Sequence, residues 1–414
     1  MSAHLPTKAL LLAVRSDPAP AIAILQQLNP EMVCFFLEES CKPVVESEVH
    51  PALSQLPRCW DWILTSDPEN FPTCHQALAQ GLGPLLTTWN IAPGELAIDL
   101  TSASPAMASA MTLVGFPFST QVLLNPSQQS SEEQSNASPS SHTAENPWDE
   151  EAPRIRQEAC HAFNQGWHDA SAQAFRTLEH RVSGGLKPLY RALVDIAQGY
   201  GLWEQFQYRP AWDKLKSGSK ALELASVWGG PPAMDRVKKS LKDNLRFLES
   251  IVLDAKEIKR ALPLDLLAWG KRRGDRGRDV EIATRVLFRG LEAAAQYQLF
   301  NRYQLKSWNI AVERLPKEMQ STCQTCYLND IDGKYRLPLL GQFQALAGLG
   351  DPMGQRFNTD WPKMKSLFDA ADHAVLGYGF ESLKPERFHQ LFELTMKLTG
   401  TVVSDLPFFP TLKF

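Results

Sequence analysis

A stretch with almost no apolar side chains divides the chain and limits what it can fold into. From Asn125 to Pro153 the sequence reads NPSQQSSEEQSNASPSSHTAENPWDEEAP, in which Trp148 is the single large apolar residue. Such a segment buries too little apolar surface to offset the entropy that it would lose on ordering. It therefore predicts a flexible linker over residues 126–153, between an N-terminal domain of residues 1–125 and a C-terminal domain of residues 154–414.

The N-terminal part alternates short apolar runs with stretches of helical spacing. Apolar runs typical of buried strands occupy residues 9–14, 32–37, 62–65, 96–100 and 120–124, and helical spacing is found over residues 21–28, 71–89 and 105–114. Strands that alternate with helices indicate βαβ units, and these form a parallel sheet with right-handed crossovers. The sequence predicts an α/β Rossmann-like domain.

The C-terminal part has a different pattern. Apolar residues recur three and four positions apart over seven segments, residues 155–178, 186–206, 210–227, 234–262, 280–300, 361–376 and 385–398. This spacing is typical of amphipathic helices, and no repeat of fixed period is present. We expect an all-α domain of at least six helices.

Composition excludes several classes of protein. The chain of 414 residues has 42 Lys and Arg against 46 Asp and Glu, a net charge of −4, which argues against bulk coating of nucleic acid. No apolar stretch is long enough for a membrane span, and the first residues lack a secretory signal, so we expect a cytoplasmic protein without membrane contact. Cys323 and Cys326 have zinc-ligand spacing but no second pair nearby, and we predict neither a metal site nor a cofactor.

Two turns of the predicted sheet carry polar side chains where ligands of such sheets bind. Ser16 and Asp17 follow the first strand. After the fourth strand come Asp99, Thr101, Ser102, Ser104 and Met107, with Pro105 at the expected first position of a helix. Hydroxyl groups and backbone N–H groups at such a turn can hold a phosphate, or they can simply cap the helix.

The same turns resemble those of the CARF domain, the CRISPR-associated Rossmann fold. The resemblance rests on a Ser-Asp-Pro-x-Pro turn, on a second strand ending FFLEES, and on an Asp-x-Thr-Ser-x-Ser-x-x-Met turn. Relatives typically have Asp-x-Thr-Gly-Gly-Thr-Lys-x-Met there. Asp99, Thr101 and Met107 match that pattern, Ser104 replaces the second Thr, and the two Gly and the Lys are replaced. The resemblance implies that Ser16, Asp17 and the residues of the second turn bind a cyclic oligoadenylate, weakened by these losses.

The helical part resembles the HEPN region of type III CRISPR ancillary proteins. The resemblance rests on three segments, residues 157–178, 190–215 and 285–303. HEPN nucleases are metal-independent endoribonucleases that use an Arg and a His within a segment such as Arg-Asn-x-Ser-x-Leu-Ala-His-Gly. The corresponding residues 371–379 place Ala371 at the Arg, Asp372 at the Asn and Tyr378 at the His. The resemblance implies a homodimer, with single-stranded RNA as a possible partner and with the ribonuclease motif lost. Asp372, His373 and Tyr378 are the candidate catalytic residues that remain.

Other interpretations stay open. Arg156 and His161 have the spacing of the lost pair, and His373 lies beside a carboxylate, so the chain could be an active endoribonuclease with non-standard residues. It could also be a helical interaction protein, outside CRISPR systems, that binds another nucleotide. The basic run from Lys271 to Arg278 contains two Gly and predicts a mobile loop, either solvated or in contact with RNA phosphates. We expect a CRISPR-associated antiviral defence protein that senses a cyclic oligoadenylate.

Overall fold

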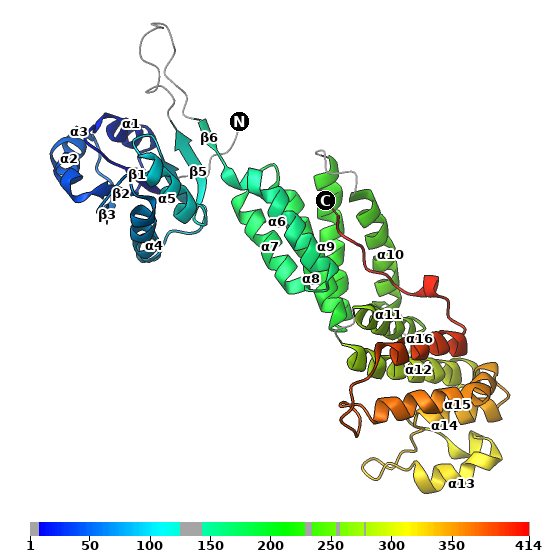
Figure 1. Ribbon diagram of the computed structural model, residues 1–414. Coiled ribbons are helices and arrows are strands. Elements are labelled where there is room, and N and C mark those ends of the chain that lie inside the picture. Colours follow the sequence, from blue (N-terminus) through cyan, green and yellow to red (C-terminus); the bar gives the residue numbers. More distant parts are fainter. Residues whose placement is uncertain (1–7, 125–142, 228–233, 254–256, 277–278, 414) are drawn as a thin grey trace.

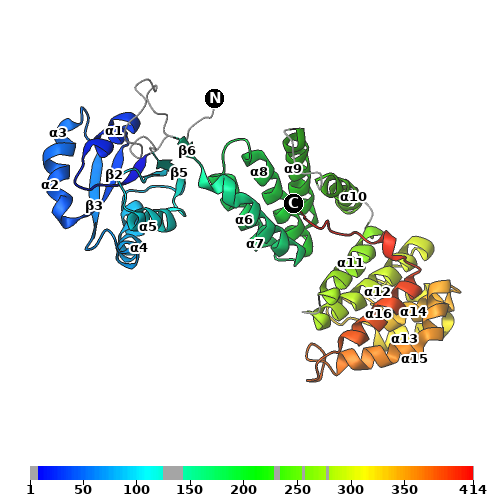
Figure 2. The same ribbon diagram turned by 45° about the horizontal axis from the view of Figure 1, so that its top comes forward.

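The computed structural model describes residues 8–124, 143–227, 234–253, 257–276 and 279–413. In it the chain forms an elongated molecule with the sheet domain at one end and the helices stacked toward the other (Figure 1, Figure 2). The predicted order, a Rossmann-like domain followed by helices, is confirmed.

The sheet has the strand order β3-β2-β1-β4-β5-β6. Five strands are parallel, namely β1 (Ala9–Ala13), β2 (Met32–Glu38), β3 (Cys59–Thr65), β4 (Leu96–Asp99) and β5 (Ser119–Leu124), and β6 (Thr143–Glu145) pairs antiparallel with β5. Every residue of β1 is buried, because β1 is central and has helices on both faces. This explains its unbroken apolar run.

Helices cover the two faces of the sheet. α4 (Phe71–Thr88) and α5 (Pro105–Gly115) pack on one face, and α1 (Ala19–Leu28) packs on the other. A run of short helical turns over residues 39–52, which includes α2 (Lys42–Val44) and α3 (His50–Ala52), follows β2 and joins the second face. The reversal of strand order between β1 and β4 creates the crevice at which ligands of such sheets bind.

The end of the predicted linker is folded. Residues 125–142 lie outside the described residues, but residues 143–145 form β6 and residues 147–153 begin α6 (Pro147–Asn164). The reason is Trp148, whose ring stacks on Phe116 at a centroid distance of 4.5 Å and whose Nε1–H donates to the Ser119 carbonyl at 2.8 Å. One buried indole supplies the apolar area that the rest of the segment lacks.

The helical part has two cores, whereas the sequence predicted one helical domain. The first core lies within α6, α7 (His168–Arg181), α8 (Lys187–Glu204), α9 (Tyr208–Val227) and α10 (Met234–Val252). We call these helices the first helical unit. α8 and α9 approach closely, since a Cβ on Gly199 would lie 2.6 Å from Leu215 and one on Gly218 would lie 2.8 Å from Ile196.

The second core, in what we call the second helical unit, lies within α11 (Ala261–Asp275), α12 (Val280–Tyr303), α13 (Lys317–Cys326), α14 (Leu339–Gly348), α15 (Pro352–Asp372) and α16 (Pro385–Thr399). Residues 400–413, which we call the C-terminal tail, then return to the first helical unit. There Leu412 is buried and exchanges two hydrogen bonds of 2.9 Å with Asn164. The tail therefore connects the two cores.

The basic run differs from its prediction. Residues 271–275 complete α11 instead of forming a loop, and residues 277–278 lie outside the described residues. The side chains of Arg272 and Arg273 both bind the buried carboxylate of Glu204 on α8, at 2.8 and 3.3 Å. Two of the charges in the run are thus used between the helical units, and they are not free for RNA.

Within the described ranges, no helix combines the length and the apolar character needed to cross a bilayer.

The close approach of α8 and α9 gives the first prediction. Gly218→Ala should lower the free energy of unfolding by about 1–3 kcal/mol, because the added methyl group overpacks against Ile196 and the backbone of α8. Helix propensity alone would favour Ala by about 1 kcal/mol, so the sign of the change is diagnostic. Chemical denaturation measures it. Gly83→Ala, inside α4, where an added Cβ would meet only Phe118 at 3.9 Å, is the matched control and should keep or raise the stability; an equal loss from both substitutions would contradict the packing argument.

Candidate functional site

The turn after β4 is organised by a buried carboxylate. Asp99 is the last residue of β4 and is 1% exposed. Its Oδ1 accepts a hydrogen bond from the Thr101 hydroxyl at 2.7 Å and a longer one from the Thr101 backbone N–H at 3.4 Å. This Asx-type turn fixes the backbone directly after the strand, at the carboxyl edge of the sheet.

Two of the predicted ligand residues are used in packing. Ser104 is the N-cap of α5: its hydroxyl oxygen accepts from the Met107 N–H at 3.1 Å, and its hydroxyl donates to the Pro68 carbonyl. Met107 is fully buried in the core beneath the sheet. The structure therefore uses Ser104 as a helix cap, which is one of the two roles that the sequence left open.

Ser102 has a different environment. Its hydroxyl is covered and has no hydrogen-bond partner among the described residues. Because a serine side chain turns about a single bond, this hydroxyl can be offered to a ligand without moving the backbone. Of the hydroxyl groups in the turn, that of Ser102 is free to donate and accept, and that of Thr101, which donates to Asp99, can still accept.

The turn after β1 lies at the same edge of the sheet. β1 and β4 are parallel neighbours, with Leu12 paired to Asp99. Ser16 is exposed, whereas Asp17 accepts from the Ala19 N–H at 3.0 Å at the start of α1. Arg15 begins this turn and was not among the predicted ligand residues; it is an exposed cation whose side chain pairs with Glu69 at 2.9 Å. The structure thus brings the two predicted turns together.

The segment over residues 371–379 begins at the end of α15 and continues as a tight loop. Ala371 is buried, and the Asp372 carbonyl accepts from the N–H groups of Tyr378, at 2.7 Å, and Gly379, at 3.1 Å. We call residues 373–381 the motif loop. Its outer surface is apolar and open: Tyr378 is 92% and Phe380 is 94% exposed.

An arginine that sequence reasoning missed lies against this segment. Arg285 of α12 donates from Nη2 to the Ala371 carbonyl at 2.7 Å, and its Nη1 lies 3.6 Å from the Asp372 carboxylate. It is 86 positions away along the chain, so no local pattern could have identified it. His373 is exposed, and its Nδ1 is 2.7 Å from the Asp369 carbonyl, which leaves Nε2 to face solvent.

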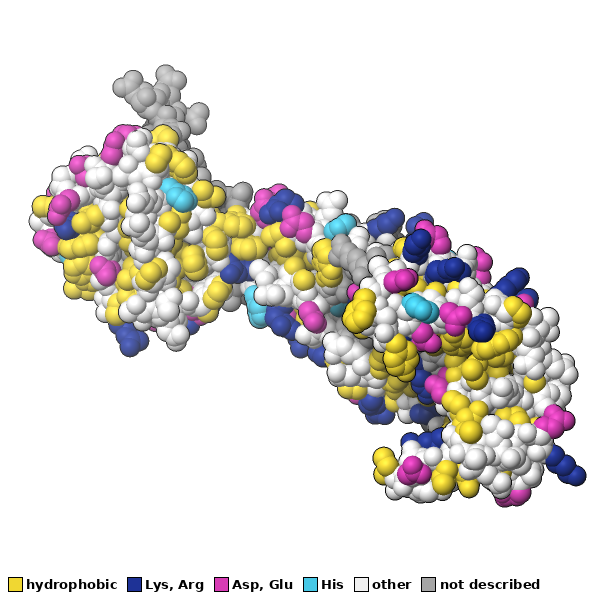
Figure 3. All heavy atoms as spheres, turned by 60° about the horizontal axis from the view of Figure 1, so that its bottom comes forward, with side chains coloured by type: hydrophobic (Ala, Val, Ile, Leu, Met, Phe, Trp, Pro, Cys, Tyr) yellow, Lys and Arg dark blue, Asp and Glu magenta, His cyan; other side chains and the backbone are white. Residues whose placement is uncertain are grey.

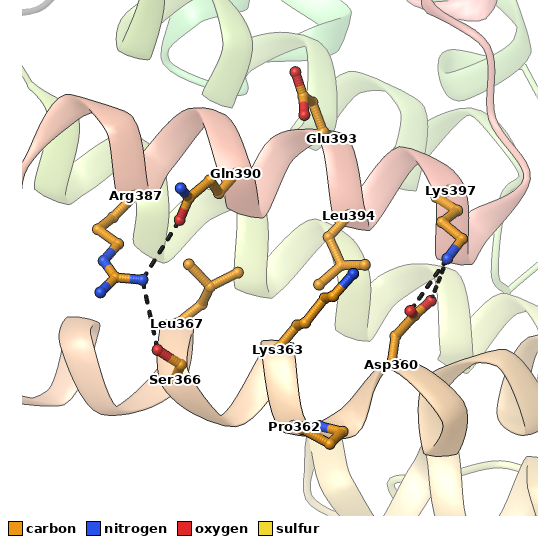
Figure 4. Close-up of a pocket in the computed structure, with 10 residues that line it drawn as sticks. All are labelled: Asp360, Pro362, Lys363, Ser366, Leu367, Arg387, Gln390, Glu393, Leu394 and Lys397. Carbon is orange, nitrogen blue, oxygen red and sulfur yellow. Dashed lines mark hydrogen bonds and ion pairs between the residues drawn. The ribbon is translucent and has the colours of Figure 1, made fainter.

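A groove between α15 and α16 adjoins the motif loop, which connects these two helices. The groove has a volume of about 590 Å³ and contains the cations Lys363, Arg387 and Lys397 (Figure 4). Asp360 binds Lys397 at 2.8 Å, and Arg387 lies 3.5 Å from the hydroxyl of Ser366. On the face in Figure 3, most Lys and Arg side chains lie over the helical part, where Asp and Glu side chains are interspersed with them. The groove also contains the carboxylates of Asp360 and Glu393, so three cations stand beside two anions.

The alternative pair lies elsewhere. Arg156 and His161 are on α6, in the first helical unit beside the sheet domain, whereas α15 belongs to the second helical unit (Figure 1). Arg156 lies near the Tyr190 side chain, whose pKa is raised by burial and lowered in part by the charge of Arg156. The structure does not bring this pair to the motif loop.

In the part of the chain that the structure describes, no group of three or more His, Cys, Asp or Glu side chains is placed to bind a metal ion.

Comparison with known proteins agrees with this architecture. Residues 252–401 match the family model described as the Csm6 HEPN domain, and residues 152–248 match the one described as the Csm6 6H domain. No curated protein matches. A similar solved structure is Enterococcus italicus Csm6 bound to cyclic hexa-2'-fluoro-hexa-dAMP, with a TM-score of 0.56 and 12% identity over 95% of this chain and 94% of that one. At that identity the likeness concerns the fold. The two matched models correspond to the two helical units.

The capping role of Ser104 gives the second prediction. Ser104→Ala should lower the free energy of unfolding by about 1 kcal/mol, because the Met107 N–H loses its acceptor at the start of α5. Thermal or chemical unfolding measures it. Ser102→Ala is the control: it removes a hydroxyl without a partner in the described protein, so stability should stay the same or rise. A larger loss from Ser102→Ala than from Ser104→Ala would contradict the assignment.

Proposed function

This chain belongs to the CARF–HEPN ancillary proteins of type III CRISPR systems, and from that premise we propose that it is a defence protein that senses a cyclic oligoadenylate at the carboxyl edge of its sheet. The similar structure of Enterococcus italicus Csm6 was solved with cyclic hexa-2'-fluoro-hexa-dAMP. The proposal rests on the residues at that edge, because the fold alone does not fix a ligand.

The observation that carries the proposal is the state of the turn after β4. Asp99 fixes the turn, Ser104 and Met107 are used in packing, and the Ser102 hydroxyl has no partner among the described residues. With the Thr101 hydroxyl and the exposed Ser16 in the turn after the neighbouring strand β1, it forms a polar set at the switch point of the sheet. These hydroxyl groups suit the ribose and phosphate oxygens of a nucleotide, and Arg15 adds a cation at the same edge.

We further propose that the ribonuclease motif is lost. The position of the family Arg is occupied by Ala371, a buried apolar residue, and the position of the family His by Tyr378. A phenol is not the proton donor and acceptor that an imidazole is in HEPN chemistry. On this proposal the protein transmits ligand binding to a partner and does not itself cut RNA.

One observation favours a second candidate, an active endoribonuclease with non-standard residues. Arg285 of α12 places a guanidinium group at the backbone of Ala371, and His373, two residues further along the chain, has its Nε2 free. The pair could supply charge stabilisation and proton transfer of the kind that HEPN chemistry uses. The cations of the groove between α15 and α16 would then contact RNA phosphates.

The proposed assembly is a homodimer that uses the motif loop. Tyr378 and Phe380 are almost fully exposed, and Val375 and Leu376 are more than half exposed. Exposed apolar side chains this close together are unusual on a monomer and typical of an interface. A ligand with two-fold symmetry also favours an isologous pair of chains.

A cleavage assay separates the two functions. We expect no cleavage of a fluorescent single-stranded RNA above background, with or without cyclic tetra- or hexa-adenylate, because loss of one electrostatic stabiliser alone costs about 10²–10³ in rate. Stimulated cleavage that Arg285→Ala or His373→Ala abolishes, and that Arg156→Ala leaves intact, would establish the second candidate instead.

Calorimetric titration tests the sensor. The double variant Thr101→Ala, Ser102→Ala should bind cyclic hexa- or tetra-adenylate about 5- to 100-fold more weakly, since each neutral hydrogen bond contributes about 0.5–1.5 kcal/mol. Pro105→Lys should strengthen binding by restoring a cation at the turn. Ser104→Ala is the matched control, which should lose stability and keep its affinity. Unchanged affinity in the folded double variant would remove the turn from the binding site.

Light scattering tests the dimer. The double variant Tyr378→Ser, Phe380→Ser should shift the protein toward monomer at micromolar concentration, because it removes the most exposed apolar area of the motif loop. Ile331→Ser, at another highly exposed apolar position, serves as the control and should leave the dimer intact. A strictly monomeric wild type, with and without ligand, would refute the proposed assembly.

A further inference from the structure

A buried histidine without hydrogen bonds lies where the two helical units and the C-terminal tail meet. His168, the first residue of α7, is 4% exposed, and neither of its ring nitrogens has a hydrogen-bond partner among the described residues. Its ring packs against those of Phe163, at 4.9 Å, and Phe409 of the tail, at 6.0 Å. Burial lowers the pKa of His168 to about 4, so the imidazole is neutral near pH 7 and keeps one donor and one acceptor unused.

Two arginines of α11 and its C-terminal end share a cavity with this histidine. The cavity has a volume of about 250 Å³ and is lined by His168, Arg272 and Arg276 together with residues of the tail. We call it the junction cavity. One water needs about 10–15 Å³, so the cavity has room for a far larger group. Its walls come from all three parts of the helical region.

Each arginine has donor capacity left over. Arg272 uses Nε on Glu204, at 2.8 Å, and Nη1 on the Pro407 carbonyl, at 3.3 Å, but its buried Nη2 has no partner among the described residues. Arg276 is half-buried and forms no ion pair with any described residue, and desolvation lowers its pKa. Its guanidinium group occupies the space beside Gly166, where a Cβ would lie 2.1 Å from Nη1.

The anionic groups of this region are already paired. Glu204 is bound by Arg272 and Arg273, and Asp279 is bound by Arg273 at 3.1 Å. Asp275, which also lines the junction cavity, is bound by Lys271 at 2.8 Å. Arg276 therefore lines the cavity without an ion pair to any carboxylate among the described residues.

We propose that the junction cavity binds a phosphate group, either as free phosphate or as the phosphate of a mononucleotide. Guanidinium groups and a neutral imidazole are suitable donors for phosphate oxygens, and partial burial strengthens each bond. The site is separate from the edge of the sheet and from the motif loop, and it does not depend on the function proposed above. A phosphate bound there would contact α7, α11 and the tail at once, and would stabilise the contact between the helical units.

Titration of the full chain with inorganic phosphate, AMP and adenosine at matched ionic strength tests this proposal. We expect phosphate and AMP to bind and to raise the melting temperature, and adenosine to do neither. Equal affinity for phosphate and AMP would identify phosphate alone as the ligand, whereas tighter binding of AMP would identify the nucleotide. No binding of either would overturn the proposal.

Variants locate the binding. Arg276→Gln and, separately, His168→Phe should each weaken the affinity for phosphate or AMP about tenfold or more, as expected when a donor to an anion is lost. His168→Phe preserves the aromatic packing and introduces no unpaired polar atom, so it guards against loss of folding. Arg236→Gln on α10, an exposed arginine outside both proposed sites, should leave the affinity unchanged. Affinity that survives both cavity variants would show that the phosphate binds elsewhere.

Discussion

The contact between the two helical units depends on two buried carboxylates, Asp265 of α11, which accepts from Trp203 and Tyr208 at 2.9 Å, and Glu204 of α8. Glu204, at the end of α8, is held by Arg272 and Arg273 of α11, and these guanidinium groups lower its pKa against the desolvation that would raise it. Breaking such a buried pair by removing one partner costs about 3–5 kcal/mol. Arg272 also binds the Pro407 carbonyl and lies 3.9 Å from the centre of the Phe409 ring, so the same residue holds the tail. Two separate cores thereby meet through an electrostatic contact that the tail covers.

The two proposed ligand sites contrast in how their polar groups are used. At the edge of the sheet, Asp99 and Ser104 shape the turn, and Ser102 is left without a partner among the described residues. At the junction, Glu204 binds Nε of Arg272, and the ring nitrogens of His168 are left without a partner among the described residues. Burying an unpaired polar group is costly, so each such group calls for an explanation, and at these two places a ligand supplies one.

Local sequence patterns predicted what depends on neighbouring residues. The strands of the sheet are apolar runs because both faces are covered, and the helices show regular spacing because one face packs. The errors involve partners distant in the chain. Trp148 folds the end of the expected linker by stacking on Phe116. Arg272, expected in a loop, lies in α11 and binds Glu204, which is 68 positions away on α8. Arg285 reaches Ala371 across 86 positions, and no spacing rule could have paired them.

Hydrogen–deuterium exchange of the full chain, with and without cyclic tetra- and hexa-adenylate, tests the central claim most directly. The account predicts that one of these ligands slows exchange at the backbone amides of residues 100–104 and 15–17, where the turns after β4 and β1 share an edge of the sheet. Exchange that neither ligand changes at these turns, under conditions where the protein is folded, would contradict the assignment of the sensor site.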